Sequence, residues 1–369
     1  MDRDEQIASL RLIRTPNIGQ MTFSLLLQRY DSARAALDAI PELARRGGRS
    51  LKPASRAAAT AEIEAVEAAG AKLLFKGGDD YPKALERFDD APPVLSARGT
   101  TALLSSPSIA VVGARNASIN AVRLAQTLSE QLAANGYVVV SGLARGIDTA
   151  AHNGALARGT VAVIAGGIDI QYPPENADLH DAIAESGLLL AEMPPGTQPT
   201  PRHFPIRNRI IASLALGVLV IEAAQRSGSL ITAREAGERG GEVMAVPGSP
   251  LDGRTEGCNH LIREGATLVR DIDDILECLA SPPVASLPTA KEWRDARLSP
   301  GTEKEIEASC TRILAALGAE ATDIDEIIRW CDEPVSAGLV AILELELAGR
   351  ISRHHGNRIC RIADAGTSD

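Results

Sequence analysis

Aromatic residues make up only 3% of this 369-residue chain, with four phenylalanines, four tyrosines and two tryptophans. Long apolar runs are also missing. The longest, from Ile210 to Val220, is interrupted by Ser213 and Gly217. It is well short of the roughly 20 residues that a membrane-spanning helix needs, so we expect no membrane span.

Paired cysteines and a secretion signal are absent as well. The five cysteines form no C-x-x-C pair and have no histidine at metal-ligand spacing, which predicts free thiols and no metal site. The first residues, MDRDEQIASL, are charged where a secretory signal would carry its apolar core. We therefore expect a cytoplasmic protein, and its hydrophobic fraction of 45% allows a sizeable core.

Signatures of nucleotide hydrolysis and cofactor binding are missing too. The chain has no G-x-x-x-x-G-K-[ST] loop, and the turn GARNAS at Gly113 is not the G-x-G-x-x-G dinucleotide fingerprint. No serine stands in G-x-S-x-G, and no histidine and carboxylate can be paired from the sequence. We expect no cofactor and no catalytic residues.

Acidic residues are missing from two segments of a chain whose formal net charge is −10. Between Asp90 and Asp148 the only acid is Glu130, and there is none between Glu192 and Glu222. If these two segments meet in space, an acidic protein still has a positive pocket. The arginines in them are Arg98, Arg115, Arg123 and Arg145, then Arg202, Arg207 and Arg209.

The length predicts two or three domains. Residues 1–68 carry apolar residues at helical spacing, interrupted by prolines and glycines, and predict a small helical domain. Its turn TPNIG is similar to a helix-hairpin-helix or SAM-like element, whose amides can meet a phosphate. Ordinary packing of two helices explains the same turn.

Between about residues 69 and 280, short β-branched runs alternate with longer helical stretches. Nearly continuous apolar runs are typical of strands covered on both faces. The alternation predicts an α/β domain with an extended Rossmann-like, doubly wound and mainly parallel sheet. The expected strands are 109–114, 137–142, 161–166, 188–193, 218–223, 243–248 and 266–270.

The remaining residues predict a linker at 281–300, a winged helix at 301–363 and a tail at 364–369. The expected recognition helix, Val335 to Leu347, has no Lys or Arg and carries Glu344 and Glu346, which suits a protein contact better than a major groove. The basic residues are in the wing: Arg350, Arg353, His354, His355 and Arg358.

Ligands of an open parallel sheet bind at the carboxyl ends of the strands. Glycine and serine there let amides approach an anion, although a tight turn or a helix cap explains each one separately. Arginine adds a planar fork that fits phosphate, but a single arginine can equally form a surface ion pair. The residues at these ends are Gly113, Arg115, Ser141, Gly142, Arg145, Ser227, Gly228 and Ser229.

The segment FPIRNRII, from Phe204, sets two arginines two residues apart on an expected helix. Arg207 and Arg209 must then face different ways, so at most one of them can contact a given ligand directly. Phe204 is either a core anchor or a platform on which a nucleobase stacks.

Four long motifs in order, SGLARGIDTAAHNGAL, GGIDIQYPPEN, AEMPPGTQPTPRHFPIRNRIIA and SGSLITAREAGERGGEVMAVPG, resemble the DNA-processing protein A (DprA, also called Smf) family, as does GCNHLIREGATLV after them. The resemblance implies a non-catalytic protein that binds single-stranded DNA and loads the recombinase RecA during natural transformation, with a single-strand-binding protein as a further candidate partner. By the same resemblance, DNA contacts fall to Arg115, Phe204, Arg207, Asn208 and Arg209.

Two departures from the family pattern affect this assignment. Pro201, Arg202 and His203 stand where many members have a lysine, and Ala114 stands where many have a serine. The resemblance also implies a homodimer through the carboxyl end of the Rossmann domain, on a surface shared with RecA. That surface maps to Asn259, Ile262 and Leu268, of which the last two fit a core equally well.

Two other functions fit the sequence less well. A phosphoribohydrolase would need a P-G-G-x-G-T-x-x-E loop, which SGSLITAREA resembles only distantly. A transcription factor would need a basic recognition helix, which this chain lacks. The sequence therefore favours a protein that binds single-stranded DNA.

Overall fold

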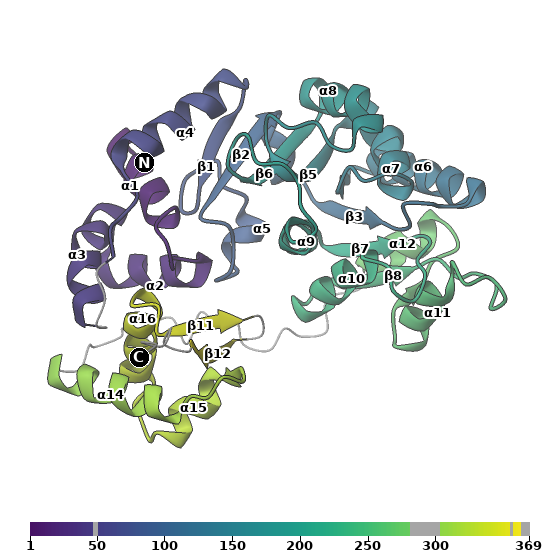
Figure 1. The fold of residues 1–369 in the computed structure, drawn as a ribbon. Helices are drawn as coiled ribbons and strands as arrows, with labels where there is room; N and C mark the ends of the chain where they lie inside the picture. Colours follow the sequence, from purple (N-terminus) through teal and green to yellow (C-terminus); the bar gives the residue numbers. More distant parts are fainter. Residues whose placement is uncertain (47–50, 281–302, 355–356, 363–369) are drawn as a thin grey trace, which may run out of the picture. The chain divides into compact units, whose positions relative to one another are not determined.

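The computed structural model describes residues 1–46, 51–280, 303–354 and 357–362. The predicted linker at 281–300, the predicted tail at 364–369 and His355 lie outside the described residues. The chain forms two compact units (Figure 1). The terminal unit combines residues up to Thr60 with the described C-terminal residues, and the Rossmann unit begins at Ala61.

The Rossmann unit is built on one nine-stranded sheet in the order β1-β2-β6-β5-β4-β3-β7-β8-β9. Strands β3 to β9 are parallel, which confirms the predicted doubly wound sheet. The strands are β1 (Lys72–Phe75), β2 (Val94–Gly99), β3 (Ser108–Val112), β4 (Val138–Ser141), β5 (Thr160–Gly167), β6 (Leu188–Met193), β7 (Gly217–Val220), β8 (Glu242–Ala245) and β9 (Thr267–Leu268).

Helices cover both faces of this sheet, because the strands point apolar side chains to both sides. Val112, Val140 and Val163 pack under α5, α9, α10 and α11, whereas Val111 and Val139 pack under α6, α7 and α12. The helices are α5 (Lys83–Glu86), α6 (Ile119–Ala134), α7 (Ile147–Ala155), α8 (Ala177–Ser186), α9 (His203–Leu214), α10 (Ser229–Glu238), α11 (Glu256–Arg263) and α12 (Ile272–Ala280).

Strands β1 and β2 were not predicted. They pair antiparallel with each other, and β2 pairs antiparallel with β6. β1 is half exposed and β2 ends in Ala-Arg-Gly, so neither forms the long apolar run that marks the central strands. They extend the sheet on one side and leave the carboxyl ends of the parallel strands open.

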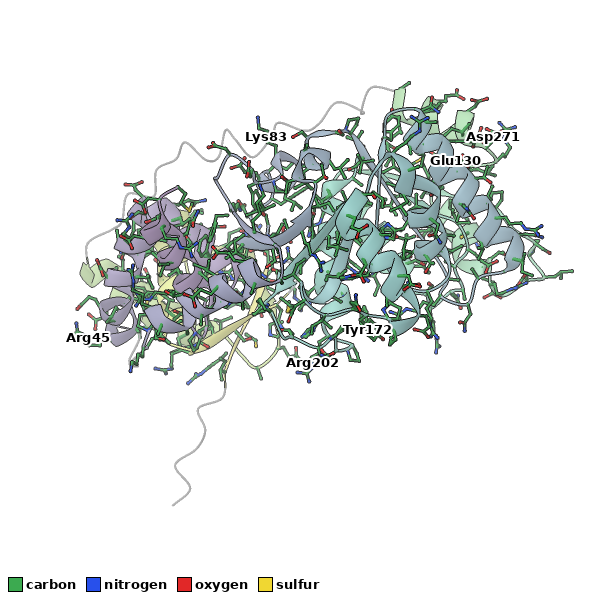
Figure 2. The ribbon with its side chains drawn as sticks, turned by 90° about the horizontal axis from the view of Figure 1, so that it is seen from above. Arg45, Lys83, Glu130, Tyr172, Arg202 and Asp271 are labelled. Carbon is green, nitrogen blue, oxygen red and sulfur yellow. The ribbon has the colours of Figure 1, made fainter. Side chains whose placement is uncertain are left out.

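The strand order reverses direction between β3 and β7. The chain leaves β3 toward β4, β5 and β6, and later returns to β7 on the other side of β3. Such a switch point opens a crevice at the carboxyl ends of the strands. Tyr172, which follows β5, and Arg202, which precedes α9, are both exposed on this unit (Figure 2).

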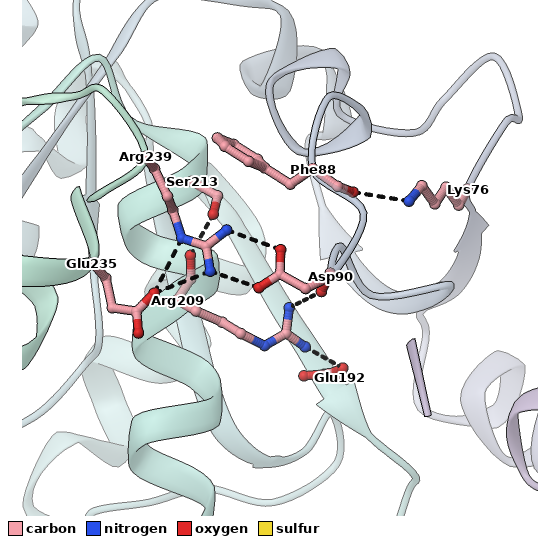
Figure 3. A network of polar contacts seen from close by, with 8 residues as sticks. All are labelled: Lys76, Phe88, Asp90, Glu192, Arg209, Ser213, Glu235 and Arg239. Atoms are coloured by element: carbon pink, nitrogen blue, oxygen red, sulfur yellow. Dashed lines mark hydrogen bonds and ion pairs between the residues drawn. The ribbon is translucent and has the colours of Figure 1, made fainter. Parts of the chain in front are cut away.

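A polar network fastens α9 to its surroundings (Figure 3). Arg209 donates to Glu192 Oε1 and to the Asp90 carbonyl, each at 2.6 Å. Arg239 makes a bidentate pair with the Asp90 carboxylate at 2.9 and 2.6 Å and also binds Glu235. These contacts tie α9 and α10 to the segment that leads into β2.

The terminal unit contains the predicted helical domain and winged helix. In the part of the chain that the structure describes, no helix is long and apolar enough to cross a lipid bilayer. The elements of the terminal unit are α1 (Arg3–Ile13), α2 (Gln20–Tyr30), α3 (Ala33–Arg46), the start of α4 (Arg56–Ala68), α14 (Glu303–Ala316), β10 (Thr322–Asp323), α15 (Ile324–Trp330), α16 (Val335–Leu347), β11 (Ile351–His354) and β12 (Arg358–Arg361).

The Asp90 carboxylate makes the stability of the Rossmann unit depend on pH. Burial alone would raise the pKa of Asp90, but the hydrogen bonds and charge of Arg239 outweigh it and lower the pKa. A carboxyl with a lowered folded-state pKa contributes stability above its unfolded pKa of about 3.9, and this is lost as the pH falls through the folded value. We expect urea unfolding to show Asp90→Asn as destabilising at neutral pH, with the difference from wild type shrinking below about pH 4. Asp79→Asn, at an exposed aspartate of the same unit, should show no such difference.

Candidate nucleic-acid site

An aromatic pair lies beside the first turn of α9. The ring centroids of Phe204 and Tyr172 are 6.1 Å apart and the ring planes are tilted by 50°. The guanidinium of Arg115 lies 4.9 Å from the Phe204 ring centroid, and Tyr172 is 42% exposed. Arg115 is exposed and forms no ion pair with any described residue. An unpaired planar cation and two rings suit a flat ligand that carries negative charge.

Two cavities share this aromatic pair as a wall. One has a volume of about 210 Å³ and reaches the loop after β4 and the Tyr172–Glu175 segment. The other, of about 560 Å³, extends to Asn208 and to the start of α10. The residues that line both are Arg115, Ala144, Tyr172, Phe204 and Arg207. The crevice predicted at the strand ends is therefore a hollow with a positive, partly aromatic lining.

Arg207 is a buried arginine that faces the strand ends. Its Nη1 donates to the carbonyls of Gly142 and Val163, the latter at 2.6 Å, and its Nε donates to Asn208 Oδ1 at 3.0 Å. Burial lowers the pKa of Arg207 to about 10, so the guanidinium keeps its charge at neutral pH. Arg207 thus brings a fixed positive charge to the wall of both cavities.

Arg209 has a different role. It is 6% exposed, is engaged by Glu192 and Asp90, and lines neither cavity. The prediction that the two arginines of FPIRNRII face different ways is confirmed. The placement of Arg209 among the DNA contacts is not supported, because its charge is already neutralised by a buried carboxylate.

Three of the predicted strand-end residues have packing roles, and two of them, Gly113 and Gly142, also line a cavity. Ser141 is fully buried and donates to the Val111 carbonyl at 2.6 Å. A Cβ on Gly113 would come within 2.6 Å of Ile147, and one on Gly142 within 2.5 Å of Arg207 Nη1. The absence of a side chain at Gly142 therefore leaves room for the Arg207 guanidinium beside the end of β4.

The loop after β4 is held in one conformation. Burial raises the pKa of Asp148, whose carboxyl accepts from the amides of Gly142 at 3.1 Å and Ala144 at 3.3 Å. Leu143 has a φ of 55°, which non-glycine residues seldom adopt, and its carbonyl accepts from Asn176 at 2.9 Å. A conformation that costs free energy persists here because several side chains fix it.

The remaining predicted residues divide into two groups. Ser227, Gly228 and Ser229 line the larger cavity at the start of α10, where helix amides and the helix dipole favour an anion. Arg145 lines the smaller cavity and lies 3.4 Å from Glu175, both being exposed. Arg202 is exposed but lines neither cavity.

The groups suited to acid–base chemistry have structural partners. Glu222 accepts from the amide and hydroxyl of Ser118, at 3.0 and 2.7 Å, and so caps α6. His152 is fully buried between Thr160 and the Leu143 amide, and burial lowers its pKa to about 3. These contacts give Glu222 and His152 structural roles, so their presence requires no catalytic role.

The three residues expected at a dimer or RecA surface differ in exposure. Asn259 makes two hydrogen bonds to Gly248, at 3.1 and 3.0 Å, and holds the loop after β8. Ile262 packs partly against the core. Leu268 is 42% exposed on β9, which ends the sheet. Of the two apolar residues among the three, Leu268 is the more exposed.

Tyr172 was missed by the sequence interpretation. It belongs to the motif GGIDIQYPPEN, but it lies in the loop beyond the glycines that end the strand. The chain has only four tyrosines, and Tyr172 lies in a loop that follows a predicted buried strand. That position is the feature of the sequence that marks it as a candidate site residue. Its closeness to Phe204 depends on the tertiary fold, since 32 residues separate the two along the chain (204 − 172).

Comparison with known proteins gives matches along most of the chain. The family described as DNA recombination-mediator protein A matches residues 72–280. A DprA-like N-terminal HHH domain matches residues 3–65, and a DprA winged helix domain matches residues 299–357. The match at 72–280 falls within the Rossmann unit and includes both cavities.

Individual relatives agree with these matches. The DNA processing protein DprA of Streptococcus pneumoniae is 50% identical over 200 residues, which cover 54% of this chain and 71% of the relative. Protein Smf of Escherichia coli is 39% identical over 290 residues, or 78% of this chain and 76% of the relative.

Two solved structures are similar as well. The X-ray structure of DprA from Streptococcus pneumoniae has a TM-score of 0.62 and 37% identity, covering 75% of this chain and 98% of that chain. DprA from Helicobacter pylori, whose structure concerns its binding of single-stranded DNA, has a TM-score of 0.53 and 30% identity over 57% of this chain and 95% of that one. The chain belongs to the DNA recombination-mediator protein A family.

Proposed function

We propose that this protein binds single-stranded DNA in the crevice beside α9 and acts as a recombination mediator. The observation that carries the proposal is the exposed Arg115, unpaired among the described residues, lying over Phe204 beside Tyr172. Unpaired bases offer flat faces that stack on such rings, and their phosphates take up the charge of arginine. The relative from Helicobacter pylori, described as binding single-stranded DNA, adds support.

The two cavities suggest how a strand would lie. Bases would stack on the Phe204–Tyr172 pair, and a phosphate would meet Arg115 and Asn208 or the amides at the start of α10. Arg207 would add a positive potential without leaving its carbonyl partners. In this arrangement Arg209 is a structural residue, and Arg202 is a peripheral contact at the position of the family lysine.

Family membership supports a wider role. We infer a cytoplasmic, non-enzymatic homodimer that hands single-stranded DNA to RecA during natural transformation and helps RecA displace a single-strand-binding protein. Leu268 at the sheet edge is our choice for an apolar contact of that interface. The hydrolase alternative has less support, since Glu192, Glu222 and His152 all have structural partners.

Truncation of the aromatic and arginine side chains should weaken binding by separate mechanisms. Phe204→Ala and Tyr172→Ala should each weaken binding of a labelled oligothymidylate about 5- to 150-fold, because each removes stacking worth about 1–3 kcal/mol. Arg115→Ala should weaken binding and also lower the slope of log affinity against log salt by about 0.7, as one phosphate contact is lost. Fluorescence anisotropy at several salt concentrations measures both quantities.

Matched controls separate this site from general surface charge. Arg123→Ala removes an exposed arginine from α6, which lines neither cavity, and should leave affinity and slope unchanged. Arg209→Ala should lower the free energy of unfolding while the folded protein still binds the oligonucleotide. Wild-type affinity in both Arg115→Ala and Phe204→Ala would contradict the assignment of the site.

The mediator role has its own test. Leu268→Asp should leave DNA affinity at low protein concentration unchanged, yet reduce dimerisation and slow RecA-driven strand exchange on DNA coated with a single-strand-binding protein. A charge at an apolar contact disrupts association. Leu216→Asp, at a 51% exposed leucine beside the amino end of β7, is the matched control. Full RecA stimulation by Leu268→Asp would remove this residue from the interface.

A further inference from the structure

Helix α16 of the winged helix lies between two hydrophobic cores. Ile342 and Leu345 belong to the core of the winged helix, together with Ile313 and Ile359. Leu343 and Leu347 belong instead to the core of the N-terminal helical domain, formed by α1, α2 and α3. One helix near the end of the chain therefore completes the core of a domain at its beginning.

Burial along α16 shows that this contact is extensive. Every residue from Val340 to Leu347 is buried, including Glu344 at 2% exposure and Glu346 at 9%. A helix that is apolar on all sides is normally buried on all sides. The run VAILELEL is buried on all sides although it contains two glutamates, and within a small winged helix a second domain is needed to cover its outer face.

The buried glutamates have basic neighbours on different elements. Glu346 lies 3.3 Å from Arg353 of β11 in the same winged helix. Glu344 lies 3.9 Å from Arg29 at the end of α2, with the two side chains 3% and 19% exposed. Because a buried carboxylate without a partner is costly, the position of Arg29 favours this pairing of domains over a nonspecific apolar contact.

The helical domain also needs the contact. A domain of about 60 residues buries only about 60% of the surface that its unfolded chain exposes and is marginally stable alone. Its apolar residues that share a cluster with Leu343 and Leu347 include Phe23, Leu26 and Leu37. Removal of α16 would return part of this cluster to water.

We propose that α16, at the position of a recognition helix, is a protein-docking helix whose partner is the α2–α3 surface of the N-terminal helical domain in the same chain. The helix has no Lys or Arg for a phosphate or a guanine, and Leu343, Glu344 and Leu347 are already engaged. The covalent link raises the local concentration of the two partners and favours docking within one chain over docking between copies.

The test uses the full-length protein with a protease recognition sequence inserted after residue 290, so that cleavage leaves both domains intact. After cleavage, the fragment that contains α16 should co-elute with the fragment that contains the helical domain in size-exclusion chromatography at micromolar concentration. Hydrogen exchange of α2 and α3 should stay as slow as in the uncut protein. Separate elution with both fragments folded would overturn the proposal.

Variants distinguish docking from simple loss of folding. Leu343→Asp should abolish co-elution, whereas Val335→Asp, at a 63% exposed residue of the same helix, should not. Since an aspartate at 343 can unfold the winged helix, the charge reversals Arg29→Glu and Glu344→Arg provide a second test. Each alone should weaken association at least about tenfold, and the double variant should recover part of that loss.

Three outcomes would contradict the assignment. Co-elution that persists in Leu343→Asp would mean that other residues hold the fragments together. Absence of recovery in the double charge reversal would remove Arg29 from the contact. Capture of the uncut protein by a tagged second copy, lost in Leu343→Asp, would place the partner of α16 on another chain.

Discussion

The position of α9 on the sheet is the constraint on which the proposed DNA site depends. Phe204 begins this helix, and its ring can meet Tyr172 and Arg115 only if the helix keeps its register against the strand ends. Two buried arginines fix that register from opposite sides. Arg207 binds main-chain carbonyls after β4 and in β5, and Arg209 binds Glu192 at the end of β6 and the Asp90 carbonyl before β2.

The two arginines offset the free-energy cost of burying a charge in different ways. Arg209 has a carboxylate partner and becomes electrically neutral with it, so it adds rigidity and little potential. Arg207 is held chiefly by main-chain dipoles, and burial lowers its pKa while the nearby charge of Asp148 opposes that effect. Among the described residues, none forms a direct ion pair with Arg207. A charge held by carbonyls remains available to a nearby phosphate. The fixed loop after β4, with Leu143 in the left-handed region, supplies one of those carbonyls in advance of ligand binding.

The sequence predicted the central parallel strands well because they are runs of apolar residues covered by helices on both faces, as β3 and β4 are. It did not predict β1 and β2, whose short, partly exposed segments take their strand form from pairing with β6. In the site, Arg115 and Phe204 could be selected from local pattern. Which of Arg207 and Arg209 meets the ligand could not, because both occupy the same turn of α9 and differ only in what the sheet places opposite them.

Net charge and site charge are separate quantities in this chain. A net charge of −10 repels DNA at long range, but at physiological salt this repulsion is screened beyond roughly 8 Å. Attraction within the crevice must then come from contacts shorter than that distance, such as stacking on Phe204 and Tyr172 and a phosphate at Arg115. A surface of this kind gains little from duplex DNA, whose bases are already stacked and whose charge is repelled. Under the proposed function, the same residues would gain most from a strand with unpaired bases, whose faces are free to stack on the two rings.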